Sequence, residues 1–274
     1  MNVADPIRRL ARLDPDATAV IRTDGAKVPF GEFDRLIDAA ARSLASLGVS
    51  AGWTVGLIVA GPDEFKGLVG AVGLARLGAA SADANLPPTR MDLFVSEGDR
   101  PAKPGVRSYT VDDIWAAMAR QPADAPPVPS HPDGAAVFRI CSSSGTTGSP
   151  KFIPITHAMM TGRAVSYTHL TLPTKALHIC AIGMGTEYGA THMLRTLWSG
   201  GALVITNPQR AHADILRHNV VSMVAPAIVL QNIVAALPDG TRPAPSLRVV
   251  EVGGSPLPAK LRALTRAPTT PPDS

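Results

Sequence analysis

The chain has 274 residues, a formal net charge of +4 and 45% hydrophobic residues, so it is long enough to bury the core of one large or two modest domains. Its 26 Lys and Arg residues are scattered along the chain, which argues against a nucleic-acid-binding surface. Two cysteines imply no disulfide framework, and the absence of a long apolar run predicts no signal peptide and no membrane span. We therefore expect a cytoplasmic protein.

Strand-like and helical segments alternate along the first half of the chain, which predicts an α/β fold. Residues 18–30 are expected to form two short strands around an Asp-Gly turn. Apolar residues at helical spacing predict a helix from 33 to 47 that ends at Gly48. A buried parallel strand at 53–60 and a helix at about 62–77 are expected to follow.

Two proline-rich stretches, 98–106 and 122–133, flank one short expected helix. We place a subdomain boundary in the second stretch, which predicts a first α/β subdomain at 1–128 and a second at 129–265. Residues 266–274 are expected to be a disordered tail. Further strands are expected in the second subdomain at 135–140, 151–156, 200–206, 220–226 and 246–252.

The segment Val165–Lys175, VSYTHLTLPTK, differs from the rest of the chain. Codons that encode this peptide match nearly all of a transposase-type sequencing adapter, so we interpret residues 165–175 as an adapter-derived insert. The alternative is a native loop in which Tyr167 and His169 would be tempting site residues. We assign no function to either side chain, and resequencing of the source DNA across this junction would test the interpretation.

The stretch SSSGTTGSPK at residues 142–151 cannot build a core, but it can bind an anion. A Walker A loop is excluded, because its lysine directly follows the last glycine and precedes a helix, whereas here Pro150 intervenes and the strand-like FIPIT follows. Successive backbone N–H groups of residues 145–148 can converge on phosphate oxygens. Neighbouring hydroxyl groups add donors, and Lys151 supplies a positive charge.

This stretch resembles the phosphate-binding signature of adenylate-forming enzymes, (Y/F)-T-S-G-(S/T)-T-G-x-P-K-G. That superfamily includes acyl- and aryl-CoA synthetases, peptide-synthetase adenylation domains and luciferases. Ser143 stands in place of the usual Thr, and Phe152 replaces the closing Gly. The resemblance implies that the following residues bind the phosphates of ATP: Ser143, Ser144, Gly145, Thr146, Thr147, Gly148 and Lys151.

The resemblance covers nearly the whole chain. LRVVEVGGSPLP at 247–258 is similar to the family strand that ends in Gly-Gly-Ala-Pro-Leu and lines the adenine pocket, although a plain turn after a strand would also explain it. GMGTEYG at 183–189 lies where the family lines its acyl pocket, so Glu187 and Tyr188 are either pocket residues or ordinary helix-start residues. The implied adenine-binding residues are Gly253, Gly254, Ser255 and Pro256.

The resemblance implies the N-terminal large domain of an adenylate-forming enzyme, with two stacked α/β subdomains and an incomplete C-terminus. The implied reaction joins a carboxylic acid to Mg²⁺-ATP to give an acyl-adenylate, after which a thiol of CoA or of carrier-protein phosphopantetheine accepts the acyl group. No segment after 258 matches the family's Y-G-x-T-E and T-G-D motifs or its C-terminal catalytic lysine. We therefore assign no catalytic residue and no protein metal ligand, and we expect the chain as written to be inactive alone.

Two alternatives remain open. The first alternative to the ligase is a non-catalytic nucleotide-binding fragment, and the second is an amidase-like hydrolase that uses Ser143 or Ser144. The hydrolase ranks last, because the sequence contains no Ser-centred G-x-S-x-G motif.

Overall fold

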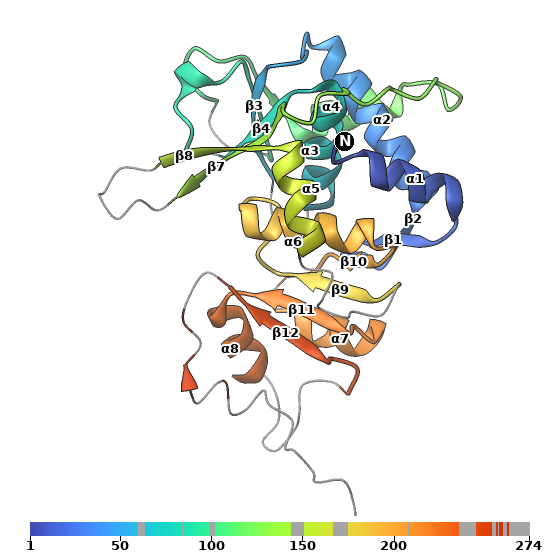
Figure 1. The fold of residues 1–274 in the computed structure, drawn as a ribbon, viewed down its shortest axis with the longest axis vertical. Coiled ribbons are helices and arrows are strands. Elements are labelled where there is room, and N and C mark those ends of the chain that lie inside the picture. The colour runs from blue at the N-terminus through green and yellow to red at the C-terminus, as the bar shows by residue number, and fades with distance from the viewer. Residues whose placement is uncertain are drawn as a thin grey trace, which may run out of the picture.

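Within the described residues, the computed structural model contains two six-stranded sheets with helices between them (Figure 1). The structure describes residues 1–59, 64–83, 85–98, 102–143, 151–166, 175–207, 209–235, 245–253, 256, 258, 259 and 262. The arrangement confirms the predicted α/β fold with two stacked subdomains.

The upper sheet of Figure 1 has the strand order β6-β5-β3-β4-β7-β8. Its neighbouring strands run parallel, except that β7 and β8 pair antiparallel. Its strands are β3 (Thr54–Ile58), β4 (Ala80–Ala82), β5 (Leu93–Ser96), β6 (Ser108–Thr110), β7 (Val137–Ser143) and β8 (Lys151–Thr156).

The lower sheet has the order β12-β11-β9-β10-β1-β2. Its strands also run parallel, except for the antiparallel pair β1 and β2, which confirms the two short strands expected around the Asp-Gly turn. Its strands are β1 (Thr18–Ile21), β2 (Lys27–Pro29), β9 (Leu177–Cys180), β10 (Ala202–Val204), β11 (Ser222–Ala225) and β12 (Val249–Val252).

Several helices form a layer between the two sheets (Figure 1). α3 packs on β3 and β4 of the upper sheet, while α2 packs on α3 and on β1 and β2 of the lower sheet. The two helices therefore join the sheets through one core. The helices are α1 (Asp5–Leu13), α2 (Phe30–Ser46), α3 (Glu64–Leu77), η2 (Pro88–Arg90, a 3₁₀ turn), α4 (Val111–Ala119), α5 (His157–Ser166), α6 (Glu187–Trp198), α7 (Ala211–His218) and α8 (Ala227–Ala235).

Sheet membership does not follow chain order. β1 and β2 precede the expected boundary at residue 128 but belong to the lower sheet, and β7 and β8 follow it but belong to the upper sheet. The physical reason is pairing: β1 lies parallel to β10, and β7 lies parallel to β4. Strands from both sides of residue 128 therefore contribute to each sheet.

The close packing of α2 on α3 depends on small side chains. A Cβ atom added to Gly73 of α3 would lie 3.2 Å from the Cβ atom of Ala40 in α2. Gly48 ends the neighbouring turn with φ +93°, a conformation that glycine adopts without strain, as the sequence predicted. The shared core between the sheets is therefore built around two closely approaching backbones.

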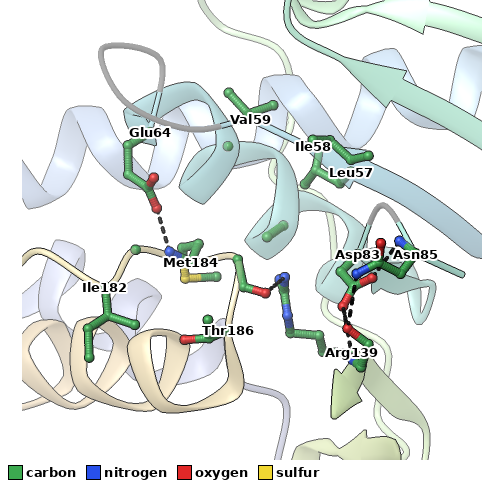
Figure 2. A pocket seen from close by; sticks show the side chains of 15 residues that line it. Leu57, Ile58, Val59, Glu64, Asp83, Asn85, Arg139, Ile182, Met184 and Thr186 are labelled. Atoms are coloured by element: carbon green, nitrogen blue, oxygen red, sulfur yellow. Dashed lines mark hydrogen bonds between the residues drawn. The ribbon is translucent and has the colours of Figure 1, made fainter. Parts of the chain in front are cut away.

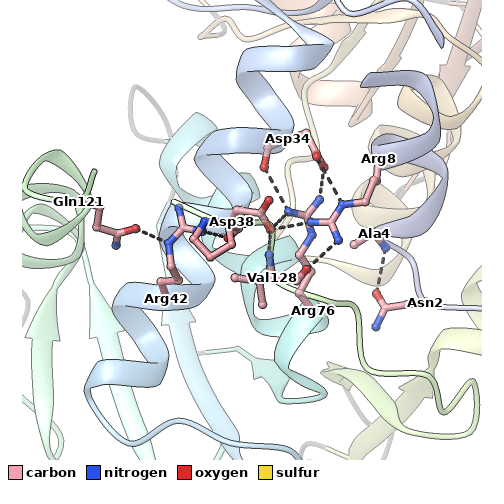
Figure 3. Close-up of polar contacts among 10 residues, drawn as sticks. Asn2, Ala4, Arg8, Asp34, Asp38, Arg42, Arg76, Gln121 and Val128 are labelled. Carbon is pink, nitrogen blue, oxygen red and sulfur yellow. Dashed lines mark hydrogen bonds and ion pairs between the residues drawn. The ribbon is translucent and has the colours of Figure 1, made fainter. Parts of the chain in front are cut away.

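A buried ion-pair network ties α1, α2 and α3 together (Figure 3). Arg76 of α3 is 1% exposed and pairs with Asp34 and Asp38, both on α2. Arg8 of α1 pairs with the same two carboxylates, and the backbone N–H of Val128 donates to Asp38 at 3.1 Å. Each buried charge therefore has a partner, as burial of charge requires.

The strand order of the upper sheet reverses at β3. The chain runs from β3 through α3 to β4 on one side, and then to β5 on the other side of β3. In open parallel sheets, ligands bind outside the carboxyl ends of the strands at such a reversal of strand order. The topology therefore places the candidate site at the carboxyl end of β3, which ends at Ile58.

Three predicted segments fall wholly or partly outside the described residues. These are residues 144–150 of the phosphate loop, residues 167–174 of the expected insert and the expected tail at 266–274. Of the insert, the structure describes Val165 and Ser166 at the end of α5, and Lys175, whose ammonium group lies 2.8 Å from a carboxylate oxygen of Asp14. The insert and the disordered tail remain predictions.

Candidate functional site

A cavity of about 410 Å³ opens at the carboxyl ends of β3 and β4, beside the segment that links β9 to α6 (Figure 2). It therefore lies where the strand order of the upper sheet reverses and where the lower sheet contributes the exit of β9. Its charged and polar lining residues are Glu64, Asp83, Asn85, Arg139, Ser142 and Thr186.

The root of the predicted phosphate loop borders this cavity. Ser142 of β7 lines it, and its backbone N–H donates to Asp83 at 2.9 Å. The hydroxyl group of Ser142 also donates to Asp83, and Asn85 lies 3.4 Å from that hydroxyl oxygen. The residues directly after β4 therefore hold the end of β7 at which the predicted phosphate loop begins.

Ser143 and Lys151 stand opposite each other as the last described pair of β7 and β8. The backbone positions of both candidates are therefore set by strand pairing, and Lys151 is exposed. The candidates Ser144, Gly145, Thr146, Thr147 and Gly148 lie outside the described residues, so their role stays a prediction.

Phe152, the departure from the family signature, has a packing role. Its ring lies against the cluster formed by Ala82, Leu86, Met91 and Phe94. The guanidinium carbon of Arg90 lies 5.4 Å from the ring centroid, within cation–π range.

The segment from Ile182 to Thr186 forms the wall of the cavity opposite the upper sheet. Thr186 caps α6, because its side-chain oxygen accepts the backbone N–H of Gly189 at 2.9 Å. Gly183 has φ +75°, and a Cβ atom added to Gly189 would overlap the Gly183 carbonyl oxygen. The segment is therefore folded tightly onto the first turn of α6.

Glu187 and Tyr188 are the first two residues of α6, so they are helix-start residues. Glu187 forms an ion pair with Arg163 of α5 and accepts the hydroxyl of Thr191 at 2.9 Å. Both residues directly follow Thr186, which lines the cavity, although neither lines it itself. Their assignment to the acyl pocket stays a prediction.

The structure brings one adenine candidate next to one acyl-pocket candidate. A Cβ atom added to Gly253 would lie 2.5 Å from a ring carbon of Tyr188, so the ring packs directly on the backbone that follows β12. Tyr188 also lies 3.5 Å from Glu251 of β12 through its hydroxyl group. Pro256 is exposed, and Gly254 and Ser255 lie outside the described residues.

A buried polar cluster lies next to the Tyr188 ring. The Tyr188 ring meets the His192 ring edge-on, with 4.4 Å between the ring centroids. Side-chain nitrogens of Arg195 and His192 lie 3.3 and 3.6 Å from carboxylate oxygens of Glu251. Burial and the Arg195 charge lower the pKa of His192 to about 4. Burial, with His192 and Arg195, lowers the pKa of His178 to about 3. These contacts join α6 to the strand that carries the predicted adenine turn.

Glu64 and Arg139 are cavity residues that sequence reasoning missed. Glu64 begins α3, and burial raises the pKa of its carboxyl group, while the Met184 N–H and Arg139 act in the opposite direction. Arg139 is 2% exposed, and its guanidinium group donates to the Gly185 carbonyl at 3.0 Å. The available signal was a charged residue inside the otherwise apolar run AAVFRI.

A second cavity, of about 550 Å³, lies at the other end of the lower sheet, beside Thr18, Leu177 and Ala202. These residues stand at the amino ends of parallel strands, where α/β sheets do not usually bind substrates. None of the candidate residues named from the sequence lines it. The first cavity is therefore the candidate site.

Among the described residues, no group of three or more His, Cys, Asp or Glu side chains is placed to hold a metal ion. None of the described helices is long and apolar enough to cross a membrane.

Comparisons with curated proteins identify peptide synthetases and a CoA ligase as relatives. The chain is 28% identical to the nonribosomal peptide synthetase CymA of Salinispora arenicola, over 95% of this chain and 3% of that protein. It is also 28% identical to the feruloyl-CoA synthase of an Amycolatopsis species, over 93% of this chain and 55% of that protein. The chain thus spans a small part of the first protein and about half of the second.

Solved structures share the fold. The N-terminal domain of FACL13 from Mycobacterium tuberculosis matches 96% of this chain with a TM-score of 0.83 and 19% identity, over 72% of that chain. The O-succinylbenzoate CoA synthetase MenE of Bacillus subtilis, in complex with ATP and magnesium, matches 93% of this chain with a TM-score of 0.81 and 20% identity, over 56% of that chain.

The family model described as AMP-binding enzyme matches residues 96–269. This range contains the phosphate-loop signature, the first turn of α6 and the strand that leads to the predicted adenine turn. The match covers more than half of the chain, so this protein belongs to the family of AMP-binding enzymes.

Proposed function

We propose that the chain forms the ATP- and carboxylate-binding part of an AMP-forming ligase. The observation that carries the proposal is the position of the Ser143–Lys151 pair at the root of the signature loop, next to the cavity at the carboxyl ends of β3 and β4. Family membership supports carboxylate adenylation as the reaction of the whole enzyme.

The residues at this root suit a polyphosphate. Ser143 and Lys151 hold the two ends of residues 144–150 together, and the exposed ammonium group of Lys151 is available to an anion. The loop itself supplies glycine N–H groups and hydroxyl donors. Mg²⁺ commonly binds through substrate phosphates and few protein carboxylates, so ATP would bring the ion with it.

The proposed chemistry needs positioning and charge stabilisation. A carboxylate substrate, held near the first turn of α6, attacks the α-phosphate of ATP and yields an acyl-adenylate and pyrophosphate. Donors of the loop and the Lys151 ammonium group would stabilise the negative charge that builds up on the departing pyrophosphate. Gly253 and the turn after it would hold the adenine base.

The second half of the proposed reaction transfers the acyl group to a thiol. The named relatives include both peptide synthetases and a CoA synthase. Two acceptors therefore fit the proposal: CoA and the phosphopantetheine group of a carrier protein.

The test is binding by the 274-residue chain of Mg²⁺-ATP and of a panel of amino acids and aromatic acids. We expect Lys151→Met to weaken ATP binding about tenfold or more, because one charged hydrogen bond to phosphate contributes roughly 1.5–3 kcal/mol. Lys27→Met, on β2 of the lower sheet, is the matched control and should leave ATP binding unchanged.

Mg²⁺-ATP binding without binding of any carboxylate in the panel would assign the chain to the non-catalytic nucleotide-binding class. If the folded chain binds neither ATP nor any carboxylate, the proposal is overturned.

A further inference from the structure

Two buried side chains of opposite charge reach the same segment from the upper sheet. Glu64 and Arg139 lie on different elements, the start of α3 and the middle of β7. Both point across the cavity toward residues 183–186 (Figure 2).

Glu64 holds the segment through a backbone donor. Its Oε1 atom accepts the N–H of Met184, and a Cβ atom added to Gly183 would lie 3.0 Å from Oε2. Gly183 therefore leaves the space that the carboxylate occupies. The contact is buried, because Glu64 is 9% exposed and Met184 is 3% exposed.

Arg139 holds the next residue through a backbone acceptor. Its guanidinium group donates to the Gly185 carbonyl at 3.0 Å and to the Ser81 hydroxyl at 3.3 Å. α3 thus satisfies an N–H group at residue 184, and β7 of the upper sheet satisfies a C=O group at residue 185. Buried backbone groups without such partners are costly, so both contacts resist displacement of the segment.

The position of this segment sets the position of α6. Thr186 caps the helix, and the Gly183 carbonyl packs against Gly189 in its first turn. Glu187 and Tyr188 lie within that turn, and Tyr188 packs on Gly253. A displacement of residues 183–186 would therefore move the predicted acyl-pocket wall relative to the predicted adenine turn.

We propose that Glu64 and Arg139 act together as positioning residues, the Glu64–Arg139 clamp, that fix the acyl-pocket wall on the first turn of α6. The clamp holds the segment that leads into Glu187 and Tyr188, so it should govern carboxylate binding more than ATP binding. The link to carboxylate binding rests on the proposed function, whereas the clamp itself does not.

The first test needs no enzyme activity. Hydrogen–deuterium exchange is measured for the peptide covering 182–190 in four variants: Glu64→Met, Glu64→Gln, Arg139→Met and Arg139→Lys. Each Met variant removes a hydrogen bond while keeping a long side chain, and should speed exchange in this peptide about tenfold. Glu64→Gln keeps an acceptor for Met184 and should remain close to wild type.

Lys66→Met is the matched control for this measurement. Lys66 lies two residues after Glu64 on α3 but pairs with Asp112 on α4, away from the cavity. It should leave exchange at 182–190 unchanged. Unchanged exchange in both Met variants, or a uniform increase over the whole chain, would overturn the clamp.

The second test separates the clamp from the proposed function. In binding titrations, the Met variants should raise the Kd of a carboxylate that the wild type binds at least fivefold and change the Kd of Mg²⁺-ATP less than twofold. Equal changes in both constants, with altered hydrogen exchange, would overturn the positioning role. Absence of carboxylate and ATP binding by the wild type counts against the proposed function, while the hydrogen-exchange result still decides whether the clamp exists.

Discussion

Among the described glycines, Gly189 has the least space for an added side chain. It lies in the first turn of α6, where the Gly183 carbonyl occupies the space that a side chain would need. The neighbour is backbone, so it cannot rotate away. The requirement for glycine comes from this close approach rather than from a positive φ angle.

We expect Gly189→Ala to lower the free energy of unfolding by about 2–3 kcal/mol, as overpacking does in buried sites. Gly185→Ala is the matched control, because an added Cβ atom there meets no atom within 4 Å. That substitution should change stability by about 0.5 kcal/mol or less. Equal effects of the two substitutions in urea unfolding would contradict the packing described for this segment.

Some site residues could be predicted from the sequence and others could not. The signature residues were recognised because the residue types in that loop and their spacing are local features of the sequence. Glu64, Asp83 and Arg139 are far apart in the chain and meet only because β4 lies between β3 and β7. That pairing is long-range, so no local pattern revealed their common cavity.

One-sided burial made α2 predictable from the sequence. The α2 pattern of buried residues recurs at helical spacing, which made its prediction correct. By contrast, α6 buries every residue from Gly189 to Leu197 and so lacks a one-sided apolar stripe. It could not be identified by periodicity. Sheet membership across residue 128 was missed for a related reason, because strand partners are set by tertiary pairing.

The network between α1, α2 and α3 gives a test at the scale of elements. Asp38→Ala leaves Arg76 buried with one of its two carboxylate partners removed. We expect a loss of about 3–5 kcal/mol in the free energy of unfolding. Asp112→Ala breaks the exposed pair with Lys66 and should cost about 1 kcal/mol or less. Comparable losses for the two variants would show that the network does not join the helices.

Buried histidines predict how the whole molecule responds to pH. Burial, as the main cause, lowers the pKa of His157 to about 4, of His178 to about 3 and of His192 to about 4. These side chains stay neutral in the folded chain, whereas in the unfolded chain they take up protons near pH 6.5. Stability is therefore complete above pH 6.5 and falls as the pH drops from 6.5 toward 4.

The slope should reach roughly 4 kcal/mol per pH unit when all three histidines contribute, at about 1.4 kcal/mol each. Urea unfolding at pH 7, 6 and 5 measures it, and His157→Gln should remove about a third of the slope. Equal stability of the wild type at pH 7 and pH 5 would show that these side chains are not buried as neutral groups.

At the scale of the whole molecule, we propose that the two sheets and the signature loop together form a site for ATP. Calorimetric titration of the 274-residue chain with Mg²⁺-ATP tests it most directly. We predict saturable binding that Lys151→Met weakens about tenfold or more, while Lys27→Met leaves it unchanged. No measurable binding by the folded chain, or the same affinity in wild type and Lys151→Met, would contradict it.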